Sequence, residues 1–249
     1  MSGTELAVLS ALICAAAILY TSVGHAGASG YIAAMAIVGL APQEMKPTAL
    51  ALNILVATLA TARWTGNGRD LAWKSLLPLV IASVPAAFIG GALQLSGSQY
   101  RLLVGLTLLA AGIKFLLTPK PDREPDRDAA RVPWAGGLLT GASVGLLSGL
   151  TGTGGGIFLS PILLMMGWAG ARQTSGVVAP FILLNSIAGL LGNVAAIQKL
   201  PEELPVLLAS AMLGAALGTQ IGIRWVSTET LQRLLGIVLL VAAGKFLLS

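Results

Sequence analysis

The sequence has few charged residues, and they leave long stretches of the chain without any charge. Only 10% of its 249 residues are charged, against about 25% in an ordinary soluble domain. The stretches without Asp, Glu, Lys or Arg include 6–43, 75–100, 132–171, 173–198 and 204–223. A helix needs about 20 predominantly apolar residues to cross a bilayer, and this many apolar stretches would leave a soluble protein almost no polar surface. The sequence therefore predicts an all-α integral membrane protein, with the lipid bilayer as a partner.

Cysteine and histidine are almost absent. Cys14 is the only cysteine, which excludes an internal disulfide and any multi-cysteine metal site. His25 is the only histidine, so the chain has no obvious catalytic set. We expect no enzyme activity, no cofactor and no metal. The net charge of +5 is spread over short loops, where it reflects membrane topology rather than a nucleic-acid partner.

Acidic residues inside the apolar stretches are also missing. All ten acidic residues fall in termini or predicted loops. Cation pumps and many proton-coupled carriers use carboxylates buried in the membrane. Because this chain has none to offer, the sequence favours a small anion as its substrate.

The two halves of the chain resemble each other in sequence, which indicates an internal duplication. The segment RLLVGLTLLAAGIKFLL, which begins at Arg101, returns as RLLGIVLLVAAGKFLL at Arg233. A glycine-rich run and then an asparagine-bearing helix precede this segment in both halves, in the same order. We assign the first transmembrane repeat to 1–118 and the second to 133–249. The linker between them, 119–132, is charged and rich in proline, so no core could bury it.

Each repeat contains five apolar segments. They are 6–23, 30–40, 47–62, 75–95 and 102–117 in the first repeat, and 134–150, 157–168, 174–197, 205–223 and 234–248 in the second. The second segment of each repeat has only about a dozen residues, or roughly 18 Å of helix, which is too short for a simple crossing. Because it follows a glycine-rich run, the first two segments of each repeat are interpreted as one helix broken at membrane depth.

The topology depends on whether this short segment crosses the membrane. If it crosses, each repeat makes five passes and the repeats are inverted; if it is re-entrant, each makes four and they are parallel. The distribution of Lys and Arg favours the inverted arrangement by a small margin. We prefer it because broken helices in two inverted repeats are a common way to build a mid-membrane site. Both termini then lie outside and the linker inside, in a multi-pass protein of the bacterial inner membrane.

The two glycine-rich runs are the strongest candidates for a binding site. We call residues 22–30 the first break and residues 148–156 the second break. A helix that restarts after a break presents free N–H groups and a partial positive charge, which suit an anion. The alternative is that these glycines only let helices pack closely. The candidate substrate-binding residues here are Gly24, His25, Gly27, Ser29 and Gly30 in the first break, and Thr151, Thr153, Gly154, Gly155 and Gly156 in the second.

Further candidates lie beside or after the breaks. His25 is also the candidate for proton coupling, because ionisable groups inside a membrane are costly and tend to be functional; the alternative is a structural histidine. Asn53 and Asn185 lie in the helices that follow the breaks, as ligand contacts or as interhelical hydrogen bonds. The last candidates open the third helix of the second repeat, where helix capping is the alternative: Gln173, Thr174 and Ser175.

The glycine-rich breaks, the tandem repeat and the length together resemble the TauE/SafE family of sulfite and organosulfonate exporters. The resemblance covers nearly the whole chain. It is best in the second repeat, where glycines 154–156 are followed by Pro161 and then by the helix that opens at 173–175. The first repeat departs from the family pattern, with Ala28 and Ser29 inside the glycine run and Met35 where a proline is expected. The resemblance implies transport of small sulfur oxyanions or sulfonates.

These observations lead to one functional hypothesis and several alternatives. The hypothesis is a secondary transporter for sulfite or an organosulfonate, working by alternating access around a site between the two breaks. An anion channel would use the same residues to line an open pore, and a transporter could instead carry another sulfur-containing or carboxylate anion. A membrane enzyme and a scaffold without substrate are weaker alternatives, and a homodimer is left open.

Overall fold

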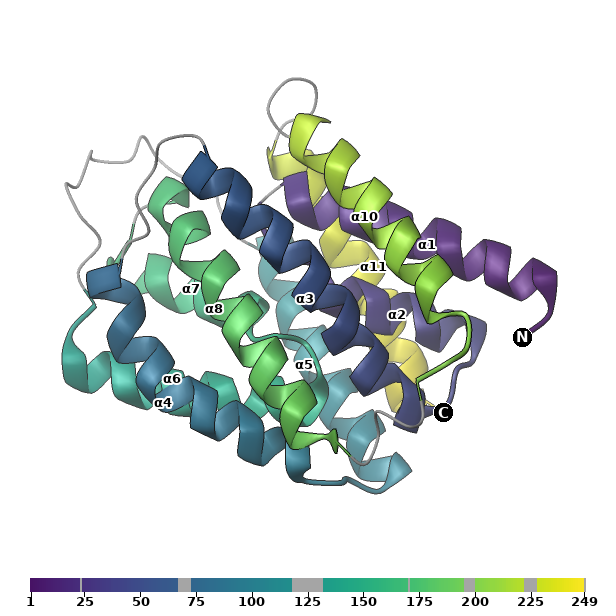
Figure 1. Ribbon diagram of the computed structural model, residues 1–249, viewed down its shortest axis with the longest axis horizontal. Helices are drawn as coiled ribbons and strands as arrows, with labels where there is room; N and C mark the ends of the chain where they lie inside the picture. The colour runs from purple at the N-terminus through teal and green to yellow at the C-terminus, as the bar shows by residue number, and fades with distance from the viewer. Residues whose placement is uncertain are drawn as a thin grey trace.

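The computed structural model describes residues 1–22, 24–66, 73–117, 132–169, 171–194, 200–221 and 228–248. Within these residues the chain forms ten α-helices and no β-strand (Figure 1). The helices of the first half are α1 (Gly3–Ser22), α2 (Ala28–Val38), α3 (Pro42–Gly66), α4 (Trp73–Ala92) and α5 (Gly97–Leu117). Those of the second half are α6 (Trp134–Thr151), α7 (Gly156–Met165), α8 (Ala171–Gly192), α10 (Leu204–Ile221) and α11 (Thr228–Leu248).

Every predicted apolar segment corresponds to one of these helices, so the all-α architecture is confirmed. The two short segments are α2, with 11 residues, and α7, with 10 residues. Among the described residues, three helices are long and apolar enough to cross a membrane by length and composition alone: α1, α3 as far as Arg63, and α4. Most of the linker 119–132 lies outside the described residues, and the assignment of repeats around it stays a prediction.

Large apolar side chains cover much of the outer surface. On α4, Leu77, Ile81, Phe88 and Ile89 are each 46–56% exposed, and α10 and α11 carry similar side chains. A soluble monomer rarely exposes contiguous apolar patches of this kind, whereas lipid tails accommodate them. The exposed surface therefore agrees with a protein embedded in a bilayer.

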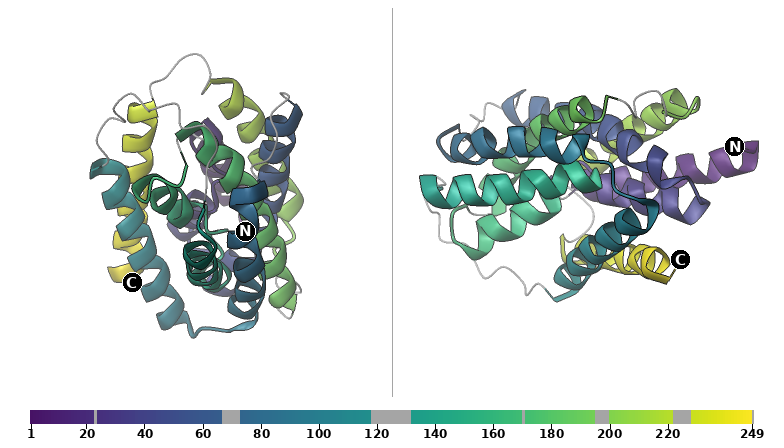
Figure 2. Two further views of the ribbon diagram at one scale, coloured as in Figure 1. Left: turned by 90° about the vertical axis from the view of Figure 1, so that its left-hand side faces the viewer. Right: turned by 90° about the horizontal axis from the view of Figure 1, so that it is seen from below.

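Helices from the two halves are exchanged between two bundles. α4 of the first half packs on α6 and α8 of the second, and α10 of the second half packs on α1 and α3 of the first (Figures 1 and 2). The remaining long helices pair with their own counterparts, α3 with α8 and α5 with α11. These contacts of α3, α4, α5, α8, α10 and α11 have equivalents when the two halves are interchanged.

Contacts between individual residues give the relative directions of the paired helices. Along α5 and α11, Gly105 lies against Leu247 and Gly112 lies against Leu240, so these helices run antiparallel. The helices α3 and α8 also run antiparallel, because Leu50 approaches Gly189 while Asn53, one turn later, reaches back to Ser186. Each of these pairs joins counterpart helices of the two halves.

Glycines bring the exchanged helices into backbone contact. Gly141, Gly145 and Gly149 of α6 lie against the carbonyl groups of Leu79, Ser83 and Ala87 of α4, in steps of one helical turn. A methyl group at any of these glycines would overlap the facing carbonyl oxygen. On the other side of the molecule, Gly214 and Gly218 of α10 meet the backbone of Cys14 and Ile18 of α1 in the same way. Small residues that let helix backbones approach are typical of helix packing in membranes, and both pairs run parallel.

Candidate functional site

The two breaks contain most of the left-handed backbone in the described chain. Between α1 and α2, Gly24 and Gly27 have φ angles of 80° and 105°. Between α6 and α7, Gly152, Gly154 and Gly155 have φ angles of 81°, 73° and 80°. Residues with a Cβ atom rarely adopt this conformation, which explains the glycines at these positions. Both α2 and α7 therefore restart directly after a left-handed glycine.

Neither restarting helix has a side-chain cap. Gly27 is the N-cap of α2 and Gly155 is the N-cap of α7, and neither cap contributes a side-chain hydrogen bond. Both helix starts are buried, with Ser29 only 1% exposed and Ile157 only 7% exposed. The first N–H groups of a helix have no partner within the helix, so a buried and uncapped start is suited to an anionic ligand.

The first break contacts the second half of the chain through His25. Its Nε2 atom lies 2.6 Å from the Oγ atom of Ser160 in α7, and the imidazole is half-buried. The hydroxyl of Ser160 also donates to the carbonyl of Gly156 at 3.0 Å, which connects the histidine to the first turn of α7. Sequence reasoning missed Ser160, because nothing in its local pattern distinguishes it from other small residues of a membrane helix.

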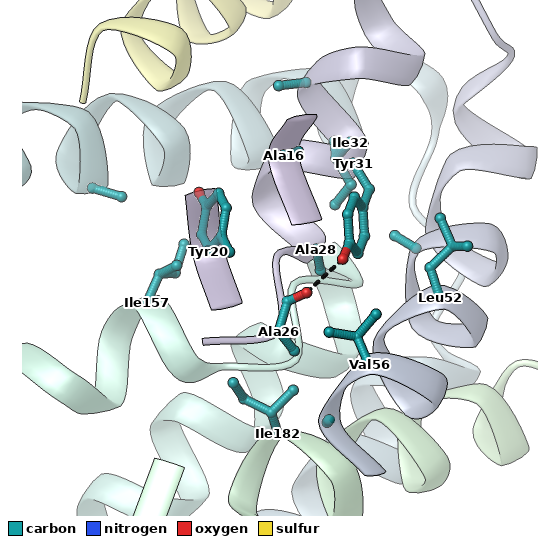
Figure 3. Close-up of a cluster of buried hydrophobic side chains, with 14 of the residues drawn as sticks. Ala16, Tyr20, Ala26, Ala28, Tyr31, Ile32, Leu52, Val56, Ile157 and Ile182 are labelled. Atoms are coloured by element: carbon teal, nitrogen blue, oxygen red, sulfur yellow. Dashed lines mark hydrogen bonds between the residues drawn. The ribbon is translucent and has the colours of Figure 1, made fainter. Parts of the chain in front are cut away.

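Two tyrosines form hydrogen bonds with a backbone carbonyl and a serine hydroxyl of the first break. The hydroxyl of Tyr31 donates to the carbonyl of Ala26 at 2.6 Å, and Tyr20 shares a 2.6 Å hydrogen bond with Ser29. Gly30 packs against Tyr20 and against α1, so its role is close helix packing. In Figure 3, Ala26 lies in a buried apolar cluster to which both halves contribute, including Val56, Ile157 and Ile182. Ala26 of the first break is therefore surrounded by apolar side chains.

The threonines of the second break bond to one another and to the helices beside them. Thr151 donates to the carbonyl of Leu147 at 2.7 Å, and its Oγ1 atom lies 2.9 Å from Oγ1 of Thr153. Tyr100 of α5 donates to the backbone carbonyl of Thr151 at 3.1 Å. Gly156 packs against Ile182 of α8, where a side chain would not fit. Both threonines are buried, and the second break is anchored by helices from both halves.

The two predicted asparagines are both fully buried, but only one reaches a break. The amide of Asn53 donates to the carbonyl of Thr153 and to Ser186, both at 3.4 Å, and it also packs against Gly154. The amide of Asn185 donates to Ser83 at 3.1 Å and to the carbonyl of Phe181 at 2.8 Å. Asn53 therefore lies at the second break, whereas Asn185 joins α8 to α4.

Several buried polar atoms of α3, α6 and α8 have no hydrogen-bond partner among the described residues. They are Oδ1 of Asn53, Oδ1 of Asn185, Oγ of Ser148 and Oγ1 of Thr48. Ser148 is adjacent to Gly155 in space, since a Cβ atom at Gly155 would lie 3.3 Å from the Cβ atom of Ser148. An unsatisfied buried polar group costs about 1–3 kcal/mol, which a bound ligand can recover. Ser148 is the first residue of the second break, but it is not among the substrate-binding residues predicted from the sequence.

The remaining candidates lie in the first turn of α8. Gln173 is half-buried and Thr174 is buried, and the side chain of Ser175 lies outside the described residues. Another residue near the second break was missed altogether. Lys46 is only 8% exposed, and it packs against Gly152. The apolar pattern predicts a third segment that begins at residue 47, whereas α3 begins at Pro42 and includes the buried Lys46.

The apolar helices and their exposed apolar surface define a helical membrane protein, and buried polar groups lie between its helices. Residues 9–246 match a family model described as sulfite exporter TauE/SafE. The chain is 39% identical over 238 residues to a "probable membrane transporter protein" of Sinorhizobium fredii, covering 93% of this chain and 94% of the relative. This chain belongs to the TauE/SafE family and is a membrane transporter.

A more distant relative comes from an archaeon. The chain is 30% identical over 131 residues to a "probable membrane transporter protein" of Methanocaldococcus jannaschii, covering 51% of this chain and 48% of the relative. No solved structure matches the chain. The family resemblance drawn from the glycine-rich breaks and the repeat is thus confirmed.

Proposed function

We propose that this chain is a secondary transporter for small anions of the sulfite and organosulfonate class, working by alternating access around a site at the two breaks. The matched family is described as a sulfite exporter, and the buried polar groups at the second break include donors that an oxyanion can use. A substrate of this kind offers three oxygen atoms that accept hydrogen bonds. Hydroxyl groups and free helix N–H groups are the donors that such oxygens need.

The observation that carries this proposal is the start of α7. It is buried, its N-cap Gly155 makes no side-chain cap hydrogen bond, and the hydroxyl of Ser148 beside it has no partner within the described chain. Asn53 adds a second donor group at Gly154, and its hydrogen bonds of 3.4 Å are long enough to be exchanged at little cost. The site therefore combines an unpartnered hydroxyl and an exchangeable amide with the partial positive charge of a helix start.

The proposal includes inverted repeats in a multi-pass protein of the inner membrane. Its support is that the counterpart helices α3 and α8 run antiparallel, as do α5 and α11. A two-fold axis in the membrane plane relates counterpart helices in this way, whereas an axis along the membrane normal would keep them parallel. The same in-plane axis relates the packing of α4 on helices of the second half to the packing of α10 on helices of the first half. The two breaks are then related as the two parts of one mid-membrane site.

Proton coupling through His25 forms a further part of the proposal. Its hydrogen bond to Ser160 links the only histidine to the first turn of α7, where the substrate is expected. A protonated imidazole beside that position would stabilise a bound anion. The apolar closure around Ala26 favours a carrier over an open pore, because a carrier must seal its site during the cycle.

A screen of ligand-induced stabilisation tests the proposal. The purified protein is heated with sulfite, sulfate, thiosulfate, sulfoacetate or taurine, and a ligand that binds the folded state raises the melting temperature in proportion to the logarithm of its concentration. Ligands that raise the melting temperature are then tested for counterflow in proteoliposomes. Saturable counterflow supports a carrier, linear flux without counterflow would identify a channel, and no stabilisation by any anion would contradict anion binding.

A further inference from the structure

A cavity lined by both polar and apolar residues lies between the protein surface and the second break. Its volume is about 80 Å³, enough for a small oxyanion or several water molecules. Its lining is formed by the start of α3, the segment that joins α4 to α5, and the ends of α6 and α8, and includes Gln43, Lys46, Gln94, Tyr100, Leu150 and Asn193. Gln43 and Gln94 are exposed, whereas Lys46, Tyr100 and Asn193 are buried. The cavity therefore has an open mouth and a buried polar floor.

The floor of this cavity adjoins the second break. Tyr100 donates to the carbonyl of Thr151, and Leu150 is the residue just before it. Lys46 packs directly against Gly152. A ligand in the cavity would thus be separated from the second break by one layer of residues.

Lys46 gives the cavity its charge. No acidic residue lines the cavity in the part of the chain that the structure describes, and the half-buried Glu44 is not among the lining residues. The ammonium group donates to the carbonyls of Gly91 at 2.9 Å, Gly90 at 3.1 Å and Leu93 at 3.3 Å. These carbonyls belong to the C-terminal end of α4, so the lysine also caps that helix.

A ligand can replace one of the three carbonyl groups that accept hydrogen bonds from Lys46. The bond to Leu93 is the longest, and Leu93 lines the cavity whereas Gly90 and Gly91 do not. A charged oxygen bonds an ammonium group more strongly than a neutral carbonyl does. An anion in the cavity can therefore replace the carbonyl of Leu93 while the other two bonds hold the lysine in place.

We propose that this cavity, here called the Lys46 cavity, is an access site at which a small oxyanion or sulfonate is held before it reaches the second break. This inference rests on the proposed function, because it assigns an anion to the transport path. The amide group of the buried Asn193 supplies a neutral donor for the ligand, and Gln94 lies at the exposed mouth. Lys46 supplies the attraction that brings an anion to this mouth of the protein.

The test measures the local charge without using transport. Cys14 is the only native cysteine, so a Cys14→Ala chain carrying Gln94→Cys has a single thiol at the mouth of the cavity. Its rate of modification is measured with an anionic sulfonatoethyl thiosulfonate and with a cationic trimethylammonioethyl thiosulfonate. We expect the anionic-to-cationic rate ratio to fall about tenfold when Lys46→Gln is added, and Lys46→Arg to preserve it. Sulfoacetate should slow the modification in the chain with Lys46.

Two control variants isolate the cavity. Gln99→Cys places the thiol on an exposed residue that does not line the cavity, and its rate ratio should change less with Lys46→Gln. Lys245→Gln removes an exposed lysine that donates to Ile37 at 2.9 Å, and it should leave the ratio at Gln94→Cys unchanged. All rates are compared on protein that elutes as a single monodisperse species.

The outcomes separate this inference from the proposed function. If Lys46→Gln leaves the anionic-to-cationic rate ratio unchanged, the inference is overturned. A lowered melting temperature in the same variant would then show that Lys46 acts only as a helix cap. Absence of protection by sulfoacetate would also overturn the inference. If the rate ratio falls and sulfoacetate slows the modification as expected, but no sulfonate shows counterflow, the assignment of an anion to the Lys46 cavity is supported and the proposed transport function is contradicted.

Discussion

The Nε2 atom of His25 lies 2.6 Å from the Oγ atom of Ser160, although the two residues are 135 positions apart in the sequence. The histidine belongs to the first break and the serine to α7, the helix that restarts after the second break. The contact therefore joins the two elements that the sequence singled out separately. It also places the only histidine within reach of the proposed anion site.

Substrate affinity should depend on pH through His25. An unperturbed histidine titrates near pH 6.5, and a bound anion favours the protonated form, so affinity should rise as pH falls. The ligand is a sulfonate whose charge is fixed, and its affinity is measured between about pH 5.5 and 8.5, a range that brackets the histidine. His25→Gln should bind with a weaker pH dependence than the wild type. Ser160→Ala retains the imidazole and should keep a pH dependence; equal profiles for wild type and His25→Gln would assign the histidine a structural role.

The inverted arrangement predicts where the termini and the linker lie. Both termini should be on one side of the membrane and residues 119–132 on the other. Reporter fusions at Ser249 and within the linker measure this, because each reporter is active on one side only. Reporters on the same side would contradict inverted repeats and favour the parallel arrangement with re-entrant short helices.

Close packing between α4 and α6 should be sensitive to a single methyl group. Gly145→Ala would press its Cβ atom into the backbone of Ser83, and overpacking of this kind costs about 1–3 kcal/mol. Gly244→Ala is the matched control, because this glycine of α11 has no neighbouring atom within 4 Å, and replacing it should be neutral or stabilising by about 0.5–1 kcal/mol. Melting temperatures of the two variants in detergent check the difference. Similar values for both would show that the glycine contact is not tight.

The sequence predicted the helices well because their lengths depend on local composition. Apolar runs and glycines mark where a chain can cross a bilayer and where it must break, and each predicted segment has its helix. The partners of the helices could not be predicted in this way. Gly145 faces α4 and Gly214 faces α1 only because α4 and α10 are exchanged between the halves, and no local pattern encodes that exchange.

The candidate site was predicted in position but not in its interactions. The positive φ angles of Gly27 and Gly155 follow from glycine at a helix restart. By contrast, the burial of Lys46 depends on a helix start five residues earlier than hydropathy indicates, since Pro42 is a helix breaker and Gln43 is polar in a local reading. Ser160 acquires its role only from a histidine in the other half.

Ser148 should bind substrate without stabilising the empty protein. Its hydroxyl is buried and has no partner within the described residues, so Ser148→Ala should leave the melting temperature unchanged or raise it. Loss of one donor to a charged oxygen should weaken sulfonate affinity about tenfold. Ser83→Ala is the control, because Ser83 accepts a 3.1 Å hydrogen bond from Asn185 and its removal should lower stability by about 1 kcal/mol. An unaltered affinity in Ser148→Ala would remove this serine from the site.

The second break should be more sensitive to substitution than another glycine with the same backbone conformation. Gly155 and Gly39 have φ angles of 80° and 92°, and an alanine at either position costs about 1–2 kcal/mol for the left-handed conformation. At Gly39 the added methyl group meets no atom within 4 Å, whereas at Gly155 it meets Phe181 and Val144 at 3.0 Å beside the start of α7.

Both alanine variants should therefore lose a similar amount of stability from backbone strain, and Gly155→Ala should lose slightly more from crowding. Their transport should differ much more. Displacing the N–H groups at the start of α7 by a few tenths of an ångström weakens the contacts of a bound anion, so Gly155→Ala should reduce counterflow at least about tenfold. Gly39→Ala lies at the far end of α2 and should retain most of the wild-type rate. Melting temperature and counterflow are measured on the same preparations, and parallel losses in the two variants would mean that Gly155 contributes only to folding.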